Sequence, residues 1–269
     1  MSGFCLDCGN IHCVCKNAKL INKDCLVAMR EMRDNCIDLT VTSPPYDNLR
    51  TYTGESKWTF ELFQDIAKEL YRITKPGGVV VWVVGDATIN GSETGTSFKQ
   101  ALWFIECGFK LHDTMIYQKN SAPQNNKRYQ PQFEYMFVLV KGKIKTFNAI
   151  KENCKKYGTH HTAGHRNKDG TIKQRNTHVK KNKVKSNIWF YYAGNGEGDK
   201  IAQLHSARFP EQLAKDHIIS WSNEGDIVFD PFMGSGTTGK MALKNNRQFI
   251  GVEISKKYYE IAKRRIYNQ

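Results

Sequence analysis

The sequence predicts an α/β fold in which helices cover both faces of a mainly parallel sheet. First, short apolar or β-branched runs alternate along the chain with segments whose apolar residues recur at helical spacing. Second, the run Val79–Val84 is apolar throughout, which is typical of a strand buried in a parallel sheet. Third, glycine- and proline-rich segments stand at the ends of strands and helices. At 269 residues, the chain has room for one large domain with an insertion.

The first elements follow from local composition. Ile37–Thr42 is a β-branched run that predicts a strand, and two prolines end it. Phe60–Thr74 places apolar residues at helical spacing and predicts a helix. Lys75–Gly78 contains a proline and two glycines, so it ends this helix and turns the chain into the strand Val79–Val84.

The same patterns continue along the chain. They predict a helix at Ser97–Cys107 and strands at Leu111–Tyr117 and Phe133–Lys141. After residue 190 the alternation resumes with the helix Pro210–Trp221, the strand Asp226–Asp230, a helix from Thr237, the strand Phe249–Glu253 and a last helix from Ser255.

One segment holds most of the chain's net charge of +14. Between Lys141 and Asn187, 14 lysines and arginines stand against two acidic residues, whereas the rest of the chain is nearly balanced. A solvated loop would explain such a block, because like charges repel. A surface for nucleic acid would explain it too, because cations that bind phosphates release counterions. A small acidic metabolite would not need so many cations.

A glycine-rich corner, Asp230–Gly239, lies between a predicted strand and a predicted helix. Glycines at such a turn let the backbone approach a ligand, and the helix N-terminus offers free N–H groups. The next predicted strand ends in Glu253, whose carboxylate can accept hydrogen bonds from ribose hydroxyls. The arrangement favours a bound adenosine cofactor over a purely structural turn.

A second corner, Thr42-Ser-Pro-Pro-Tyr46, ends an earlier strand. Its prolines fix the backbone, so that a hydroxyl and main-chain carbonyls lie rigidly at the carboxyl edge of the sheet. These acceptors can orient an amino group that attacks a methyl sulfonium and can take up its proton. The adjacent Tyr46 offers a face for an unstacked base. A proline-rich turn with a buried tyrosine would explain the tetrapeptide alone.

Together the two corners resemble the amino-methyltransferases of DNA, whose signature is [S/D/N]-P-P-[Y/F/W]. The order, with TSPPY early and DPFMGSGTTG and FIGVE late, is similar to the circularly permuted β group of that family. Further matches are Leu20–Cys25, Lys75–Gly78 and His205–Pro210, so the resemblance covers residues 18 to 267. It implies a Rossmann-like class I S-adenosylmethionine-dependent methyltransferase fold with a mostly parallel seven-stranded sheet, circularly permuted and carrying an inserted target-recognition region.

The resemblance also implies roles for single residues. Asp24 and Cys25 would lie at the cofactor's adenine, although Lys23 stands where relatives often have glycine, and Glu253 would hold its ribose. The methionine part would be wrapped by the late glycine corner, with Phe209 near it: Asp230, Pro231, Phe232, Gly234, Ser235, Gly236, Thr237 and Thr238. The catalytic pocket for the target base would consist of Ser43, Pro44, Pro45 and Tyr46.

Ser43, which opens the tetrapeptide, bears on the choice of base. Family members with serine here tend to modify N4 of cytosine, and those with aspartate or asparagine tend to modify N6 of adenine. We expect cytosine N4, with adenine N6 as the alternative because exceptions exist. Methylation of RNA or of protein glutamine normally comes with the opposite motif order. A catalytically inactive nucleic-acid-binding protein of this fold is a more distant alternative.

The resemblance divides the chain into four parts: a Cys-rich segment (1–17), a catalytic half (18–144), a basic target-recognition insertion (145–190) and a cofactor-binding half (191–269). Double-stranded DNA is the expected partner, held by Lys180, Lys181, Lys183 and Lys185. The histidines in the insertion are read as solvated or DNA-facing residues. A homodimer and a cognate restriction endonuclease are further partners that the family allows.

The first segment contains Cys5, Cys8, Cys13 and Cys15, spaced C-x2-C-x4-C-x-C. Four thiolates can close a structural zinc site, and a stretch too short for a core would need one. Free thiols at a frayed terminus are the alternative. The sequence shows neither a signal peptide nor an apolar run long enough to span a membrane, so we expect a cytoplasmic protein. A prokaryotic or phage origin is what the resemblance implies. The Pro-Cys motif of 5-methylcytosine enzymes is absent.

Overall fold

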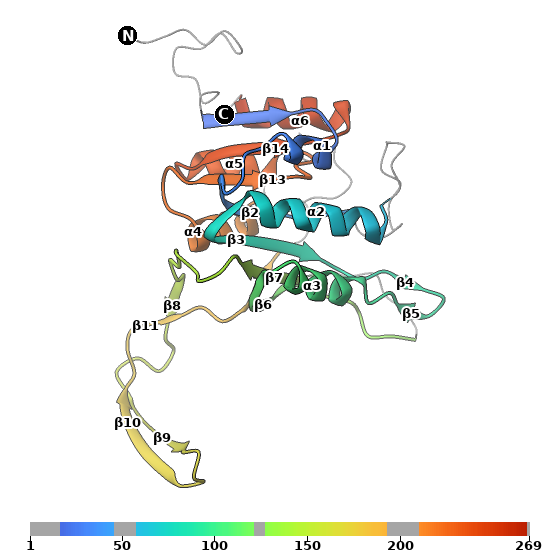
Figure 1. Cartoon of the computed structure of the whole chain (residues 1–269). Helices are drawn as coiled ribbons and strands as arrows, with labels where there is room; N and C mark the ends of the chain where they lie inside the picture. Colours follow the sequence, from blue (N-terminus) through green and yellow to red (C-terminus); the bar gives the residue numbers. More distant parts are fainter. Residues whose placement is uncertain (1–16, 46–57, 121–126, 193–209, 268–269) are drawn as a thin grey trace, which may run out of the picture. The chain divides into compact units, whose positions relative to one another are not determined.

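A computed structural model of the protein describes residues 17–45, 58–120, 127–192 and 210–267. An eight-stranded sheet runs through the main unit, which is the described chain outside residues 149–186. From one edge to the other (Figure 1) the strands are β1 (Ala18–Ile21), β14 (Gln248–Val252), β13 (Ile227–Asp230), β2 (Ile37–Thr42), β3 (Thr74–Val84), β7 (Phe133–Val140), β6 (Lys110–Lys119) and β12 (Ile188–Tyr191). All neighbours are parallel except β7, which runs antiparallel to β3 and β6. The predicted mainly parallel sheet is confirmed, and β12 adds one strand to the seven expected.

Six helices pack on this sheet within the described residues: α1 (Cys25–Arg30), α2 (Phe60–Ile73), α3 (Thr96–Glu106), α4 (Glu211–Trp221), α5 (Thr237–Lys244) and α6 (Lys256–Tyr267). The first three pack against one another in order, and so do the last three, which gives two helical layers (Figure 1). The expected helices on both faces are therefore confirmed. Among the described residues, no helix is long and apolar enough to cross a membrane.

Local patterns did not reveal the shortest elements. The strands β1 and β12 have four residues each, and α1 has six, too few to show a period. A two-residue pair, β4 (Thr88–Ile89) and β5 (Ser92–Glu93), was also missed. β1 and β12 depend on tertiary partners, since β1 pairs with β14 and β12 pairs with β6, whereas β4 and β5 pair with each other as a local hairpin.

The predicted turn at Lys75–Gly78 lies inside β3 rather than before it. The register with β2 jumps from the pair Ile37–Thr74 to the pair Leu39–Val79, so these four residues form a bulge. Gly77 has φ +83°, and its N–H donates to the carbonyl of Lys141 at 2.7 Å. The helix still ends at Ile73, as the proline requires.

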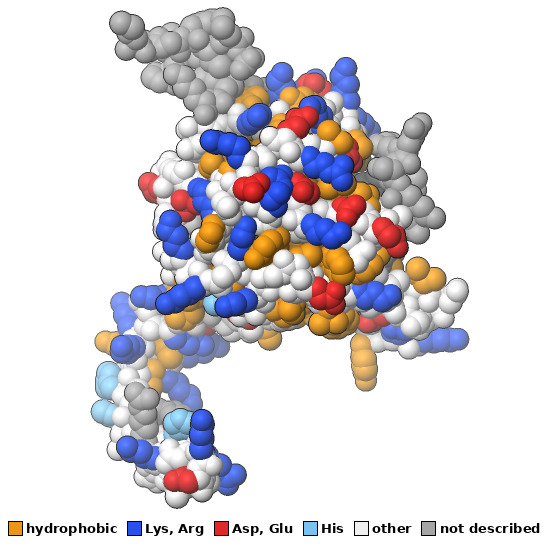
Figure 2. Space-filling model, viewed as in Figure 1, with side chains coloured by type: hydrophobic (Ala, Val, Ile, Leu, Met, Phe, Trp, Pro, Cys, Tyr) orange, Lys and Arg blue, Asp and Glu red, His pale blue; other side chains and the backbone are white. Residues whose placement is uncertain are grey.

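A second compact unit, Ala149–Ser186, contains the most basic part of the chain. It has two antiparallel hairpins, β8 (Lys151–Asn153) with β11 (Asn182–Val184) and β9 (His160–Arg166) with β10 (Ile172–His178). Lysine, arginine and histidine side chains are visible along it (Figure 2). The charged block is thus paired β structure, whereas sequence patterns predicted no strand there.

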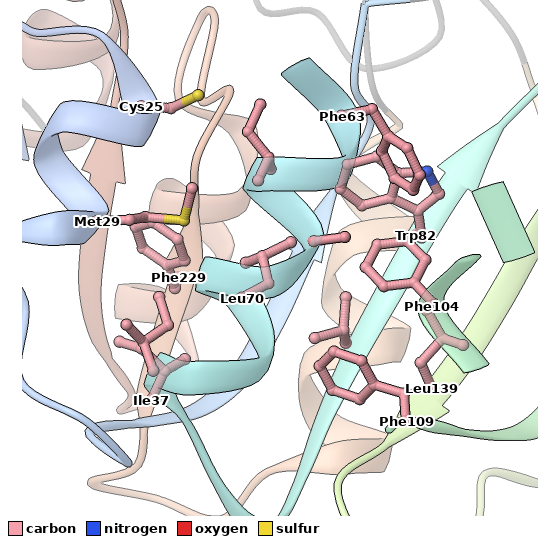
Figure 3. Packing of buried hydrophobic residues seen from close by; sticks show 14 of the residues in the cluster. Cys25, Met29, Ile37, Phe63, Leu70, Trp82, Phe104, Phe109, Leu139 and Phe229 are labelled. Atoms are coloured by element: carbon pink, nitrogen blue, oxygen red, sulfur yellow. The ribbon is translucent and has the colours of Figure 1, made fainter. Parts of the chain in front are cut away.

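The hydrophobic core that supports the sheet lies under α1, α2 and α3. In Figure 3, Met29 and Phe229 lie together on one side of Leu70, while Trp82 and Phe104 lie together on the other. The buried face of α2 is Phe63, Ile66, Ala67, Leu70 and Ile73, the spacing seen in the sequence. This packing fixes β2 and β3, and therefore the corner where β2 ends.

Candidate active site

The carboxyl ends of four neighbouring parallel strands carry the predicted site residues. In the sheet order β1-β14-β13-β2, Asp24 and Cys25 follow β1, Glu253 follows β14, Asp230 ends β13, and Ser43 follows β2. Because parallel strands end at the same edge, residues from both halves of the chain meet there.

A hydrogen bond joins the two corners. The Thr42 hydroxyl, just before the SPP segment, donates to Oδ1 of Asp230 at 2.7 Å, and both side chains are buried. The two residues are 188 positions apart in the sequence. A second link runs from the Thr238 hydroxyl to the carbonyl of Val41 at 3.3 Å. The glycine corner and the proline corner are therefore one connected structure.

The carboxyl group of Asp230 is the most perturbed acid at this edge. Burial raises its pKa to about 6, against an ordinary value of 3.8, although hydrogen bonds from Thr42, Phe232 and Thr238 oppose the rise. The backbone N–H of Phe232 donates to its Oδ1 at 3.0 Å. Such a buried carboxylate gains from a cationic ligand group, because a cation would offset the cost of its burial.

Glu253 is also buried, and its two oxygens are engaged by backbone groups. Oε2 accepts from the N–H of Gly234 at 2.9 Å, and Oε1 accepts from the N–H of Ser255 at 2.8 Å. Burial raises its pKa, and these N–H groups limit the rise. Each carboxylate oxygen can accept more than one hydrogen bond, so ribose hydroxyls can still bind there. The residue therefore also anchors the glycine turn, a role the sequence did not indicate.

Asp24 and Cys25 lie beside Glu253. Oδ1 of Asp24 accepts from the N–H groups of Leu26 and Val27 at 2.9 and 3.0 Å, so it caps α1. Burial raises the pKa of the Cys25 thiol to about 12, and the negative charges of Asp24 and Glu253 add to the rise. The thiol therefore stays protonated, and Cys25 packs in the core cluster.

The glycine-rich corner, here called the glycine turn, needs backbone conformations that favour glycine. Gly234 has φ +49° and Gly236 has φ +80°, in the left-handed region that favours glycine. A Cβ on Gly236 would lie 2.9 Å from Cδ1 of Ile266 and 3.0 Å from Cβ of Ala262, so α6 packs directly on this turn. Gly236 is also the N-cap of α5 and provides no side-chain cap. The first N–H groups of α5 thus start at this edge of the sheet.

An arginine of α6 that the sequence analysis did not single out binds the glycine turn through hydrogen bonds. Arg265 is buried in α6, and its Nη1 donates to the carbonyl and hydroxyl of Ser235 at 2.7 and 2.9 Å and to the Thr237 hydroxyl at 3.1 Å. Its Nη2 pairs with Glu211 at 2.9 Å, which Lys240 also contacts at 2.6 Å. The available signal was a cation among the buried positions of an amphipathic helix.

An aromatic group flanks the site. Phe232 is half-buried, and its ring meets Trp58 edge-on at 5.6 Å and Trp82 at 6.1 Å. Of the proposed base pocket, Pro44 is buried, while Ser43 and Pro45 are half-buried. Tyr46, Phe209 and the cysteines proposed for zinc lie outside the described residues: Cys5, Cys8, Cys13 and Cys15.

The lysines predicted to bind DNA belong to the second unit. Lys183, in β11, pairs with Glu152 of β8 at 3.0 Å, and this hydrogen bond raises its pKa. Lys180 and Lys181 follow β10 and are exposed, and Lys185 is half-buried. Lys183 is thus already partly neutralised within the hairpin.

The residues at the sheet edge fit an adenosine cofactor with a cationic amino-acid part. Asp230 supplies a buried carboxylate, Glu253 supplies acceptors at the end of the next strand, and Phe232 supplies an aromatic side. Residues 17–45, 58–120, 127–192 and 210–267 contain no cluster of three or more acidic, histidine or cysteine side chains that could hold a metal ion.

Comparisons with known proteins give a consistent result. A family described as DNA methylase, covering N6 and N4 enzymes, matches residues 37–264. The chain is 56% identical to the orphan methyltransferase M.BamHII of Bacillus amyloliquefaciens, over 89% of this chain and 92% of that one.

Two solved structures share the fold. PvuII DNA methyltransferase (cytosine-N4-specific) aligns with a TM-score of 0.71 at 20% identity, covering 93% of this chain and 86% of its own. The M1.HpyAVI complex with S-adenosylmethionine aligns with a TM-score of 0.62 at 23% identity, covering 93% and 98%. The methyltransferase fold expected from the sequence is confirmed.

Proposed function

Because the chain belongs to the DNA methylase family of N6 and N4 amino-methyltransferases, we propose that it transfers a methyl group from S-adenosylmethionine to N4 of cytosine in double-stranded DNA. The observation that carries the proposal is the buried hydrogen bond from Thr42 to Asp230. It ties the proposed base pocket to the proposed cofactor turn, so donor and acceptor would meet at one place.

The residues that would hold the cofactor come from three strand ends. Asp230 would bind the cationic methionine part, Glu253 would accept hydrogen bonds from the ribose, and Asp24 would lie toward the adenine. Arg265 holds the turn of Ser235 and Thr237 in shape from behind. When bound, S-adenosylmethionine supplies a methyl group activated by its positively charged sulfur.

The proline corner, Thr42–Tyr46, would bind and orient the target base. The target base leaves the helix stack and lies against Tyr46, as enzymes that modify bases within duplexes require. The hydroxyl of Ser43 and the main-chain carbonyls fixed by Pro44 and Pro45 accept hydrogen bonds from the amino group. They would aim the nitrogen lone pair at the methyl carbon. As the N–C bond forms, the sulfur–methyl bond breaks and a neutral thioether leaves, and the proton that the nitrogen loses would pass by way of these acceptors to solvent water.

Ser43 supports cytosine N4 as the target, since serine at this position resembles the N4-modifying members. Adenine N6 is the second candidate, because the matching family covers both reactions. The intact buried contacts of Thr42 with Asp230, and of Arg265 with Ser235 and Thr237, support an active enzyme over a binding protein without catalysis. The basic unit supports DNA as substrate, while a homodimer and a restriction endonuclease partner stay predictions.

Product analysis tests the proposal. The protein is incubated with isotopically methyl-labelled S-adenosylmethionine and unmethylated DNA of mixed sequence, and the digested nucleosides are analysed by mass spectrometry. We expect labelled N4-methylcytosine, and none with Asp230→Ala as the control. If N6-methyladenine is the labelled product, the target base is adenine rather than cytosine, and the proposed reaction class still holds. The absence of any labelled base would reject the reaction class.

A further inference from the structure

The hairpin of β9 and β10 is an exposed two-stranded ribbon. Its strands pair over seven positions, from His160–His178 to Arg166–Ile172. The turn is well formed, because Oδ1 of Asp169 accepts from the backbone and hydroxyl of Thr171 at 3.0 and 2.7 Å. No described side chain of either strand is buried. A ribbon of this kind is marginally stable alone, so a partner that covers it is expected.

The two faces of the ribbon differ in chemistry. Since side chains alternate along a strand, the register assigns residues to faces. One face, here called the reading face, carries His160, Thr162, Gly164, Arg166, Ile172, Gln174, Asn176 and His178. On the opposite face, His165 lies across from Lys173. Arginine, glutamine and asparagine pair specifically with the edges of guanine and adenine. Both amides of the ribbon, Gln174 and Asn176, lie on the reading face, whereas the register puts Arg175 and no amide on the opposite face.

The side chains of the reading face are held in place by one another. The Thr162 hydroxyl donates to Oδ1 of Asn176 at 2.7 Å, which orients the amide. The rings of His160 and His178 meet edge-on with centroids 5.2 Å apart. Across from Gln174 is Gly164, which has no side chain to compete for the amide. Fixed donors and acceptors lose little entropy when they bind, which favours specific recognition.

The charge of the unit indicates the partner. Residues 149–186 contain 11 lysines and arginines but two acidic residues, which is complementary to a phosphate backbone. The major groove of B-form DNA is about 12 Å wide and admits a two-stranded ribbon, and all four base pairs present distinct hydrogen-bonding patterns there, whereas the pattern in the minor groove is degenerate.

We propose that this ribbon enters the major groove with its reading face on the base edges, and that Arg166, Gln174 and Asn176 determine the sequence specificity. The inference rests on the proposed function for the kind of nucleic acid, and it assigns the specificity that the proposed function leaves open. Lys173, on the opposite face, contributes charge without reading sequence.

The test uses substitutions in one strand to separate recognition of the base sequence from attraction between the protein's positive charge and the DNA phosphates. Gln174→Ala and Asn176→Ala remove amides, while Lys173→Ala is the matched control on the opposite face of the same strand. Each variant is used to select binders from a pool of short duplexes of random sequence, and the enriched sequences are determined. Binding to the preferred duplex is then measured over a range of salt concentrations, with methyl transfer recorded separately.

We expect each amide variant to lose preference at a defined base pair by about 5- to 150-fold, the discrimination of one bidentate contact. Its salt dependence should stay unchanged. Lys173→Ala should weaken all duplexes alike, keep the preferred sequence and reduce the salt slope by up to ~0.9. Replacing only the purine at that base pair with its 7-deaza analogue should weaken the wild type and leave the matching amide variant unaffected.

The result that overturns the inference is an unchanged preferred sequence in both amide variants, whether or not affinity falls. A wild type that binds duplexes without any preference overturns it as well. Because selection by binding needs no methyl transfer, a protein that reads sequence through these amides without methylating would reject the proposed function and keep the reading face.

Discussion

Replacing Arg265 with leucine tests whether the buried arginine holds the glycine turn. The substitution removes four hydrogen bonds, three to Ser235 and Thr237 and one to Glu211. Breaking a buried ion pair by removing one partner costs about 3–5 kcal/mol. Glu211 keeps its contact with Lys240 at 2.6 Å, so we expect the lower end, about 3 kcal/mol. A loss of that size is a large part of a typical stability of about 5–15 kcal/mol.

The assay is urea unfolding of Arg265→Leu beside Arg264→Leu, its exposed neighbour on α6. The control should stay within about 0.5 kcal/mol of the wild type. Calorimetry on the folded fraction should also show weaker binding of S-adenosylmethionine by Arg265→Leu alone, since Ser235 and Thr237 shape the turn. If both variants unfold at the same urea concentration as the wild type, the reasoning about this network is refuted.

Five further predictions concern the site, the basic unit and the cysteine-rich segment. Affinity for S-adenosylmethionine should fall as pH drops through about 6, because Asp230 then takes up a proton and loses its negative charge. Calorimetry at pH 5 and 7.5 measures this change in affinity, and the Asp230→Asn variant should not show it. Tyr46→Ala should lower turnover by the loss of stacking, worth ~1–3 kcal/mol, with cofactor affinity kept. Glu253→Gln should weaken cofactor binding first, and the reverse pattern in the two variants would contradict the site map. Neutralising the predicted DNA-binding lysines should flatten the salt dependence of DNA binding. Lys183 should contribute least, because Glu152 already pairs with it. An unchanged slope of affinity against salt concentration would mean that DNA binds elsewhere on the protein. Elemental analysis should find one zinc ion per chain, and its absence together with titratable native thiols would end the zinc hypothesis for Cys5, Cys8, Cys13 and Cys15.

Local sequence was sufficient for the helix α2, for most of β3 and for the places where the two corners follow β2 and β13. The apolar period of α2 and the uniform run within β3 survive in the structure, because burial of these side chains decides both helix and strand. Prolines and glycines likewise mark their turns through backbone limits that act within a few residues. By contrast, β1 and β12 were not predicted from the sequence, and they are defined by their pairing with β14 and β6.

Tertiary structure alone decided how the corners work together. The bond from Thr42 to Asp230 follows from β13 lying next to β2, and no local pattern encodes the order of strands. The position of Arg265 on the apolar face of α6 is visible in the sequence, but its partners Ser235 and Thr237 are fixed only when α6 packs on the glycine corner. Sequence by itself determined which chemical groups are present and which turns they occupy. Long-range packing determined their distances, burial and charge states, because hydrogen bonds and desolvation depend on neighbours far away in the chain.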